Sequence, residues 1–258
     1  MATKTLPILP GVVLAYDDLW RVLRAMRTLM AYAVMIVLAF KVLDEVIPAR
    51  TMSNPLLAQF IDLAIGVAQS FCLTPIMIAV HRFIVLDEAA PAYAIDVSEP
   101  RFIAFFSWLV GLSLLSAAVF STQELLTAAG IEPRTAVGPT LMVAIVAAIL
   151  LVRFSILFPA IATGARAATA GNALAASKGH VLSMFLIYLL ALLPMAALAI
   201  GSTVMLGRGM TVRGSPVAVL DLVLGGFLNT IVIVLCVAVA SRIFQSIGSP
   251  LRAGDPAR

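Results

Sequence analysis

Long stretches without a charged residue dominate the hydrophobic pattern of the chain. The longest run, Val181–Leu206, is 26 residues. An α-helix rises about 1.5 Å per residue, so this run can cross a hydrocarbon layer of roughly 30 Å with some tilt. Four more runs are charge-free: Leu63–Val80, Phe102–Gln123, Thr135–Val152 and Leu222–Ser241. The pattern predicts an all-α, polytopic membrane protein.

We expect six transmembrane helices. The first is the weakest, because its apolar stretch, Thr28–Phe40, is only 13 residues long. The flanking Arg24, Arg27 and Lys41 must extend their stems along the helix and place their charges among the headgroups. The expected spans cover residues 25–47, 56–80, 102–122, 139–162, 181–206 and 216–241.

Composition supports the membrane class. The chain is 62% hydrophobic and 12% charged, about half the charge of a soluble domain, and its mean hydropathy is +1.09. Aromatic residues make up only 7%, and no series of short alternating strands is visible, which disfavours a membrane β-barrel.

The distribution of Lys and Arg predicts the orientation. With both termini cytoplasmic, twelve of these residues lie inside and five outside, as the positive-inside rule requires. The net charge of +4 is explained by cytoplasmic loops, and no basic patch indicates nucleic-acid binding. The outer five are Lys41, Arg50, Arg134, Arg208 and Arg213.

An amphipathic pattern precedes the first span, at about 11–27. A helix lying in the cytoplasmic interface, with Trp20 at headgroup depth, explains it. The first turns of span one, protruding into the cytoplasm, explain it equally well. The apolar face holds Val12, Tyr16, Leu19, Trp20, Leu23 and Met26, and the polar face holds Asp17, Arg21, Arg24 and Thr28.

All of these helices are expected to form a single transmembrane domain over residues 1–247. Residues 248–258 are rich in Pro, Gly and charge, which predicts a disordered C-terminal tail.

Arg153 is the most conspicuous polar residue, because it interrupts the apolar run AAILLVRFSILFPAIATG. A charge at the membrane centre costs about 2.5–3.5 kcal/mol on insertion scales. Arg153 falls in the cytoplasmic half of its span, where its planar guanidinium can bind an anionic lipid or an anionic substrate. Alternatively, it reaches the inner interface or pairs with a carboxylate such as Asp87 or Glu88.

Four further polar residues fall within the expected spans. Asp62 lies near the outer end of span two, with Gly66 and Gln69 on roughly the same face, and this stripe could serve a proton or cation relay. The alternative is an interfacial Asp62 paired with Lys41, with Gln69 bonding between helices. Asp221 opens span six, and Asn229 lies deeper, where such residues usually join helices.

No motif for catalysis, a cofactor or a metal is present. Cys72 and Cys236 lie inside expected spans as packed thiols, and His81 and His180 have no ligand-like spacing to Cys, Asp or Glu. Intramembrane enzymes need convergent nucleophiles, acids or metal ligands. The sequence therefore predicts a non-enzymatic protein without cofactors.

Two segments resemble a bacterial six-helix inner-membrane family. They are Arg153–Gly164, RFSILFPAIATG, and Ala173–His180, ALAASKGH. In that family a span carrying Arg then Pro leads into a helix of the form A-W-x-L-T/S-R/K-G-x. The element HRFIVLDE, His81–Glu88, is similar to the family's segment after span two. The chain departs from the pattern at Leu174, where Trp is usual, and at 160–162, where an acidic residue often follows Pro.

The family includes the membrane portion fused to some glycerophosphodiester phosphodiesterases. The soluble catalytic barrel of those proteins is absent from this chain, so the resemblance does not imply their activity. It implies an α-helical protein of the cytoplasmic (inner) membrane with an uncharacterised role.

Two kinds of function remain. The first is a non-enzymatic protein that binds or organises lipids, including anionic lipids, or a membrane-protein partner, with a homo-oligomer left open. The alternative is a small transporter or channel, which Asp62, Arg153 and prolines within the spans would favour.

Overall fold

The computed structural model describes residues 6–47, 55–90, 92–205 and 216–252, and no strand occurs in these ranges. The all-α class is therefore confirmed. Within the described residues, five helical segments are long and apolar enough to cross a bilayer, which is compatible with a multi-pass membrane protein. They are Leu57–Leu86, Pro100–Ala128, Pro133–Ala162, Val181–Ser202 and Val217–Ile247.

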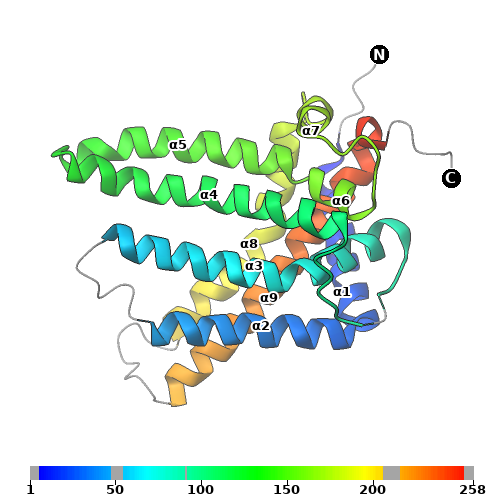
Figure 1. Cartoon of the computed structure of the whole chain (residues 1–258), viewed down its shortest axis with the longest axis horizontal. Coiled ribbons are helices and arrows are strands. Elements are labelled where there is room, and N and C mark those ends of the chain that lie inside the picture. The colour runs from blue at the N-terminus through cyan, green and yellow to red at the C-terminus, as the bar shows by residue number, and fades with distance from the viewer. Residues whose placement is uncertain (1–5, 48–54, 91, 206–215, 253–258) are drawn as a thin grey trace.

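The long helices of the described chain form three successive pairs (Figure 1). Within each pair the two helices run in opposite directions along the molecule. The pairs are α2 (Arg27–Val46) with α3 (Pro55–Leu86), α4 (Pro100–Ala128) with α5 (Pro133–Phe154), and α8 (Val181–Met205) with α9 (Pro216–Ile247).

Short helices gather at one end of these pairs, at the right of Figure 1. We call this the terminal end, and we call the opposite end, where α2, α4 and α8 finish, the hairpin end. The short elements are α1 (Ile8–Ala25), α6 (Leu157–Ala162), α7 (Ala170–Ala176) and the 3-10 helix η2 (Ser249–Arg252).

The turn between α4 and α5 shows how local sequence ends one long helix and begins the next. Gly130 adopts a positive φ of 84°, a conformation that glycine reaches without strain. The N–H of Ile131 then donates to the carbonyl of Leu126 at 3.0 Å, which satisfies the end of α4. Pro133 occupies the first turn of α5, where its missing N–H costs no hydrogen bond.

The first expected span, residues 25–47, corresponds to α2 and falls outside the five apolar segments. This 20-residue helix carries Arg27 at its start and Lys41, Asp44 and Glu45 near its end. Its length suffices for a crossing, but its charge sets it apart from the other long helices. Six spans therefore remain a prediction.

Three long helices end later than expected, and α5 begins at Pro133 rather than 139. α3 continues to Leu86 rather than 80, α4 to Ala128 rather than 122, and α9 to Ile247 rather than 241. A helix keeps its backbone hydrogen bonds when it leaves the hydrocarbon layer, so hydrophobicity alone does not locate its end.

The stretch before α2 is a helix of its own. Met26, with φ −117° and ψ 41°, separates α1 from α2, and Figure 1 shows α1 running across the direction of α2 and α3. Of the expected apolar face, Leu19 and Met26 are buried, and the place of the helix in a membrane interface stays a prediction. Trp20 is 56% exposed, and the residues that α1 buries are Ala15, Asp18, Leu19 and Val22.

The tail expected from residue 248 starts with an ordered element. In η2, Leu251 is fully buried, and the guanidinium of Arg252 lies 4.5 Å from the centre of the Phe244 ring. These contacts hold Ser249–Arg252 against α9. Residues 253–258 lie outside the described part, as do Arg50, Arg208 and Arg213, on which the orientation count relies.

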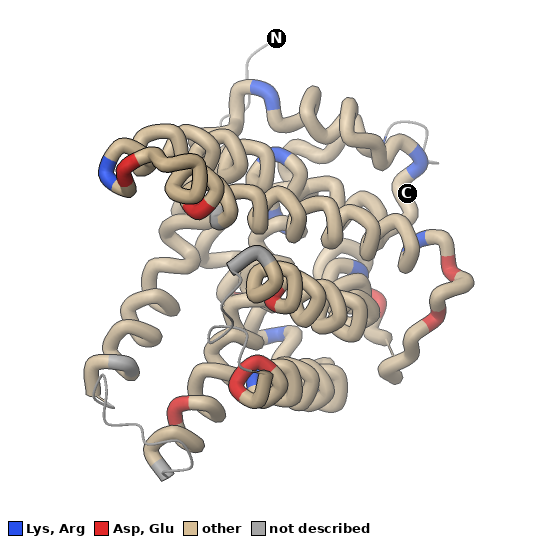
Figure 2. The backbone as a smooth tube through the Cα atoms, turned by 60° about the vertical axis from the view of Figure 1, so that its left-hand side comes forward, with Lys and Arg blue, Asp and Glu red and all other residues tan. Residues whose placement is uncertain are grey.

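The tightly packed core lies toward the terminal end. Leu73, Val80, Leu235 and Ala238 are buried where α3 and α9 meet. Toward the hairpin end, many large apolar side chains of α4, α5, α8 and α9 are exposed. Figure 2 shows long uncharged stretches of helix, with charged positions mainly toward helix ends. This distribution suits helices surrounded by lipid.

Candidate functional site

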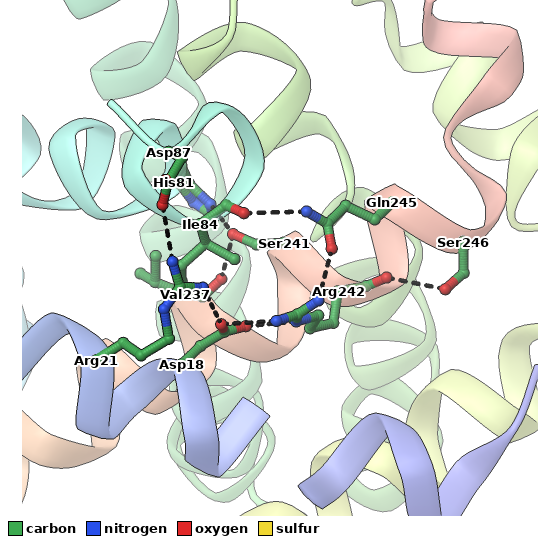
Figure 3. A network of polar contacts seen from close by, with 10 residues as sticks. All are labelled: Asp18, Arg21, His81, Ile84, Asp87, Val237, Ser241, Arg242, Gln245 and Ser246. Carbon is green, nitrogen blue, oxygen red and sulfur yellow. Dashed lines mark hydrogen bonds and ion pairs between the residues drawn. The ribbon is translucent and has the colours of Figure 1, made fainter. Parts of the chain in front are cut away.

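At the terminal end, a buried ion pair connects α1 to α9. Asp18 of α1 is fully buried, and Arg242 of α9 donates to both of its carboxylate oxygens, from Nε to Oδ2 and from Nη2 to Oδ1 at 2.7 Å (Figure 3). A buried carboxylate is tolerated only when a partner compensates its charge. The pair therefore fixes α1 to α9.

A second contact joins α1 to the end of α3. Arg21 Nη2 donates to Asp87 Oδ1 at 2.7 Å, and the Arg21 guanidinium lies 5.2 Å from the centre of the Phe83 ring. Asp87 has a positive φ of 59° and its N–H bonds to the Phe83 carbonyl at 3.0 Å, which closes α3. Asp87 thus ends one helix and binds another.

Gln245 completes the link between α9 and α3. Its amide nitrogen donates to the Ile84 carbonyl at 3.0 Å, and its amide oxygen accepts from Arg242 Nη1 at 3.1 Å (Figure 3). We call Asp18, Arg21, His81, Asp87, Ser241, Arg242 and Gln245 the terminal network.

His81 and Ser241 form a buried polar pair within this network. Nδ1 of His81 lies 2.8 Å from Oγ of Ser241, and the Ser241 hydroxyl donates to the Val237 carbonyl at 2.9 Å. The imidazole N–H is therefore assigned to donate to the serine oxygen. The hydroxyl proton points away from the base and both side chains are buried, so this Ser–His pair has the geometry of helix packing, not of an activated nucleophile.

Tyr16 holds the other side of α1. Its hydroxyl donates to the Ala191 carbonyl of α8 at 2.7 Å. Burial raises the pKa of the Tyr16 phenol, so the group stays protonated and able to donate this bond.

Arg153 binds a short helix rather than a carboxylate. Its Nε donates to Ser177 Oγ at 2.9 Å and its Nη2 to the Leu174 carbonyl at 2.6 Å, both at the C-terminal end of α7. A cation at this end also matches the helix dipole. The expected pairing of Arg153 with Asp87 or Glu88 is wrong, because these carboxylates bind Arg21 and Arg82.

A groove between α3 and α4 lies toward the hairpin end. Its volume is about 430 Å³, and it is lined on α3 by Gln59, Asp62, Leu63 and Gly66 and on α4 by leucine, serine and alanine side chains between Leu109 and Ala117. The structure therefore places Asp62 and Gly66 of the predicted stripe in one concave surface. Gln69, farther along α3, is half-buried.

The face of α3 that lines this groove continues into the core. Positions 62, 66, 69, 73, 76 and 80 follow the spacing of three and four residues that keeps side chains on one helix face. Leu73, Ile76 and Val80 are buried at the terminal end of this face. The α3–α4 groove is thus the open continuation of a packed interior.

Polar groups connect α3 and α4 at the outer limit of the groove. The Gln59 amide nitrogen donates to the Glu124 carboxylate, and Ser121 Oγ donates to Gln59 Oε1 at 2.6 Å. The expected pairing of Asp62 with Lys41 is wrong. None of the ion pairs among the described residues includes Asp62 or Lys41. Lys41 instead packs against α9, close to Gly225: a Cβ added to that glycine would lie 3.1 Å from the Lys41 Nζ.

The other predicted positions do not join either cluster. Asp221 is exposed near the start of α9, and Asn229 is half-buried farther along that helix. Among the described residues, no group of three or more His, Cys, Asp and Glu side chains is arranged to hold a metal ion.

Sequence reasoning missed the Asp18–Arg242 pair. One signal was available: Asp18 shares a helix face with Ala15 and Val22, whereas the neighbouring Asp17 lies on the exposed side. Nothing in the local pattern identified Arg242, 224 positions away, as its partner.

Comparison with known proteins adds no relative: no family model, no curated protein and no solved structure matches this chain. The resemblance to the bacterial six-helix family remains a prediction.

Proposed function

We propose that this chain is a non-enzymatic, six-span protein of the cytoplasmic membrane that binds an amine-bearing lipid in the α3–α4 groove. The groove is the observation on which the proposal rests. Both termini are assigned to the cytoplasm by the excess of Lys and Arg at the terminal end. α2 serves as the sixth span, because its 20 residues reach about 30 Å and its charges lie near its ends.

The size and lining of the groove suit part of a lipid. Its volume of about 430 Å³ falls within the usual range for small-molecule sites. Leu63, Leu109 and Leu112 offer apolar walls for an acyl chain, while Asp62 and Gln59 offer polar atoms at one end. Such a combination matches an amphipathic ligand.

The depth of Asp62 matches the headgroup level. The apolar segment of α3 runs from Leu57 to Leu86, so its midpoint falls close to Cys72. At 1.5 Å per residue, Asp62 lies about 15 Å from that midpoint, which is half the thickness of a hydrocarbon layer. Its carboxylate therefore sits where the apolar and polar parts of a lipid meet.

The charge of the groove selects the headgroup. Asp62 lines the groove and Glu124 lies at its outer limit, and none of the lining residues is Lys or Arg. A carboxylate at an interface is best compensated by a cationic donor. We therefore assign the ligand a primary amine. Arg153 is left out of this site, because two of its nitrogens already bind α7.

Native mass spectrometry of the full chain in mild detergent tests the proposal. The probes are phosphatidylethanolamine and phosphatidylglycerol with identical acyl chains. The wild type should retain the amine-bearing lipid preferentially. Gly66→Leu should abolish retention, because a side chain at Gly66 enters open groove space without a clash. Asp62→Asn should remove the preference for the amine.

Two matched variants serve as controls. Gly111→Leu adds the same side chain to an exposed, open position of α4 outside the groove lining, and Asp221→Asn removes an exposed carboxylate from α9. Both should bind lipid as the wild type does. Unchanged binding in Gly66→Leu would show that the groove is not the site, and unchanged headgroup preference in Asp62→Asn would overturn the assignment of the amine.

One observation favours a second candidate, a small transporter. The groove face of α3 continues into the interior between the helix pairs, so Asp62 lies at the entrance of a conceivable path. This candidate predicts substrate flux in proteoliposomes that Asp62→Asn abolishes and Asp221→Asn preserves. No flux across a broad panel of small cations and metabolites would rule it out.

A further inference from the structure

α1 has two apolar faces. Ala15, Leu19 and Val22 are buried against the rest of the protein. Leu9, Val13 and Trp20 are 69%, 59% and 56% exposed. At about 100° per residue, these three fall within roughly 40° of one another, on the side of the helix opposite the buried face.

The charged residues of α1 occupy a third side, next to the exposed stripe. Asp17, Arg21 and Arg24 are exposed there, and Arg27 follows at the start of α2. The guanidinium of Arg24 lies 4.8 Å from the centre of the Trp20 ring. Among the described residues, neither Arg24 nor Arg27 takes part in an ion pair.

The packed side holds this arrangement in a fixed rotation. The buried Asp18–Arg242 pair and the bond from Tyr16 to Ala191 anchor α1 to α9 and α8. The helix therefore cannot turn its apolar stripe toward the protein. α1 crosses the direction of α2 and α3 at the terminal end (Figure 1), as a helix lying along a membrane surface crosses the helices that span it.

We propose that α1 docks on a leaflet rich in anionic phospholipid, with Leu9, Val13 and Trp20 at the acyl boundary and Arg24 and Arg27 on lipid phosphates. Charge complementarity identifies the occupant: two arginines that have no carboxylate partner in the described part of the chain border an apolar stripe that ends in a tryptophan. This site lies at the opposite end of the bundle from the α3–α4 groove and takes the opposite headgroup charge.

The first test measures lipid enrichment around the full chain. The protein is reconstituted in nanodiscs containing phosphatidylcholine and phosphatidylglycerol, and co-released lipids are counted by native mass spectrometry. The wild type should be enriched in phosphatidylglycerol. Each of Arg24→Gln and Arg27→Gln should lower that enrichment by about fivefold. Arg134→Gln, an exposed charge at the hairpin end, should leave it unchanged.

The second test reports on α1 directly. Trp20 and Trp108 are the two tryptophans of the chain, so a Trp108→Phe background isolates Trp20 fluorescence. Acrylamide should quench Trp20 less in phosphatidylglycerol nanodiscs than in phosphatidylcholine nanodiscs, and Arg24→Gln with Arg27→Gln should remove the difference.

Equal quenching of Trp20 in both lipids would overturn the proposal. Unchanged phosphatidylglycerol enrichment in the variant that combines Arg24→Gln with Arg27→Gln would also overturn it. Folding of the variants is checked by the retained helical circular dichroism signal. Retention of phosphatidylethanolamine in the α3–α4 groove should be unaffected by either arginine variant, so failure here is distinguishable from failure of the groove assignment.

Discussion

At the terminal end, α9 presents Leu235 fully buried against its neighbours; at the hairpin end, the same helix presents Leu220 54% exposed. The same contrast holds on α4, where Phe105 is buried and Leu125, near the hairpin end, is exposed. Both ends are made of apolar helix, so hydrophobicity does not distinguish them.

What distinguishes the two ends is close packing and polar contact. Lipid chains are as apolar as leucine, so an apolar side chain gains little by leaving lipid for protein. The terminal end adds ion pairs, hydrogen bonds and a dense core, which lipid cannot replace. At the hairpin end, bonds of Gln59 with Glu124 and Ser121 join α3 to α4, but a groove stays open between the two helices. We infer that the terminal end determines the stability of the fold and that the hairpin end is free to bind ligands.

The largest difference between the two ends is expected when Asp18 loses its charge. Asp18→Asn leaves Arg242 without its buried counter-ion and should lower the stability by about 3–5 kcal/mol. Asp17→Asn, on the exposed side of the same helix, should change it by less than about 0.5 kcal/mol. Thermal unfolding in detergent measures both. Equal melting temperatures would show that the pair does not stabilise the terminal end.

A pair of identical substitutions on α9 compares the two ends directly. Leu235→Ala removes packed atoms at the terminal end and should cost about 2–3 kcal/mol, in the lower part of the range for soluble cores because lipid supplies no hydrophobic term. Leu220→Ala should cost less than about 0.5 kcal/mol. Chemical denaturation in mixed micelles gives the two values. A similar cost at both sites would contradict the distinction.

Arg153→Gln should have a smaller, local effect. The loss of the bonds to Ser177 and Leu174 should destabilise the end of α7 by about 1–2 kcal/mol. Lys178 is exposed at that end, so limited trypsin digestion should cut there faster in the variant. Arg134→Gln controls for the lost charge. An unchanged rate of cleavage at Lys178 would show that Arg153 does not position α7, and would return it to the anionic-lipid role predicted from the sequence.

The long helices could be predicted because lipid leaves the backbone few choices. A charge-free run must satisfy its own N–H and C=O groups, and a helix does so within one segment. The ends of α3, α4 and α9 could not be predicted, because they lie where the polar surroundings satisfy either a helix or a loop. The separation of α1 from α2 at Met26 likewise carries no clear signal in the hydrophobic pattern.

The sites were partly predictable for a related reason. Helical spacing alone placed Asp62 and Gly66 on one face, and the groove lies there. On α1, the hydrophobic pattern gave no reason to bury Asp18. The partners of Asp18 and Arg153 depend on contacts between distant segments, which spacing within one helix does not reveal.

The Asp18–Arg242 pair also constrains how the chain is made. Its members are 224 positions apart, so α1 leaves the ribosome long before Arg242 is synthesised. Until the last helix is inserted, the Asp18 carboxylate has Arg21 of its own helix as an ion-pair partner, at 3.4 Å, but lacks the two bonds from Arg242. Arg21 and Tyr16 can bind α3 and α8 before then, so the docking of α1 is completed only when α9 is in place.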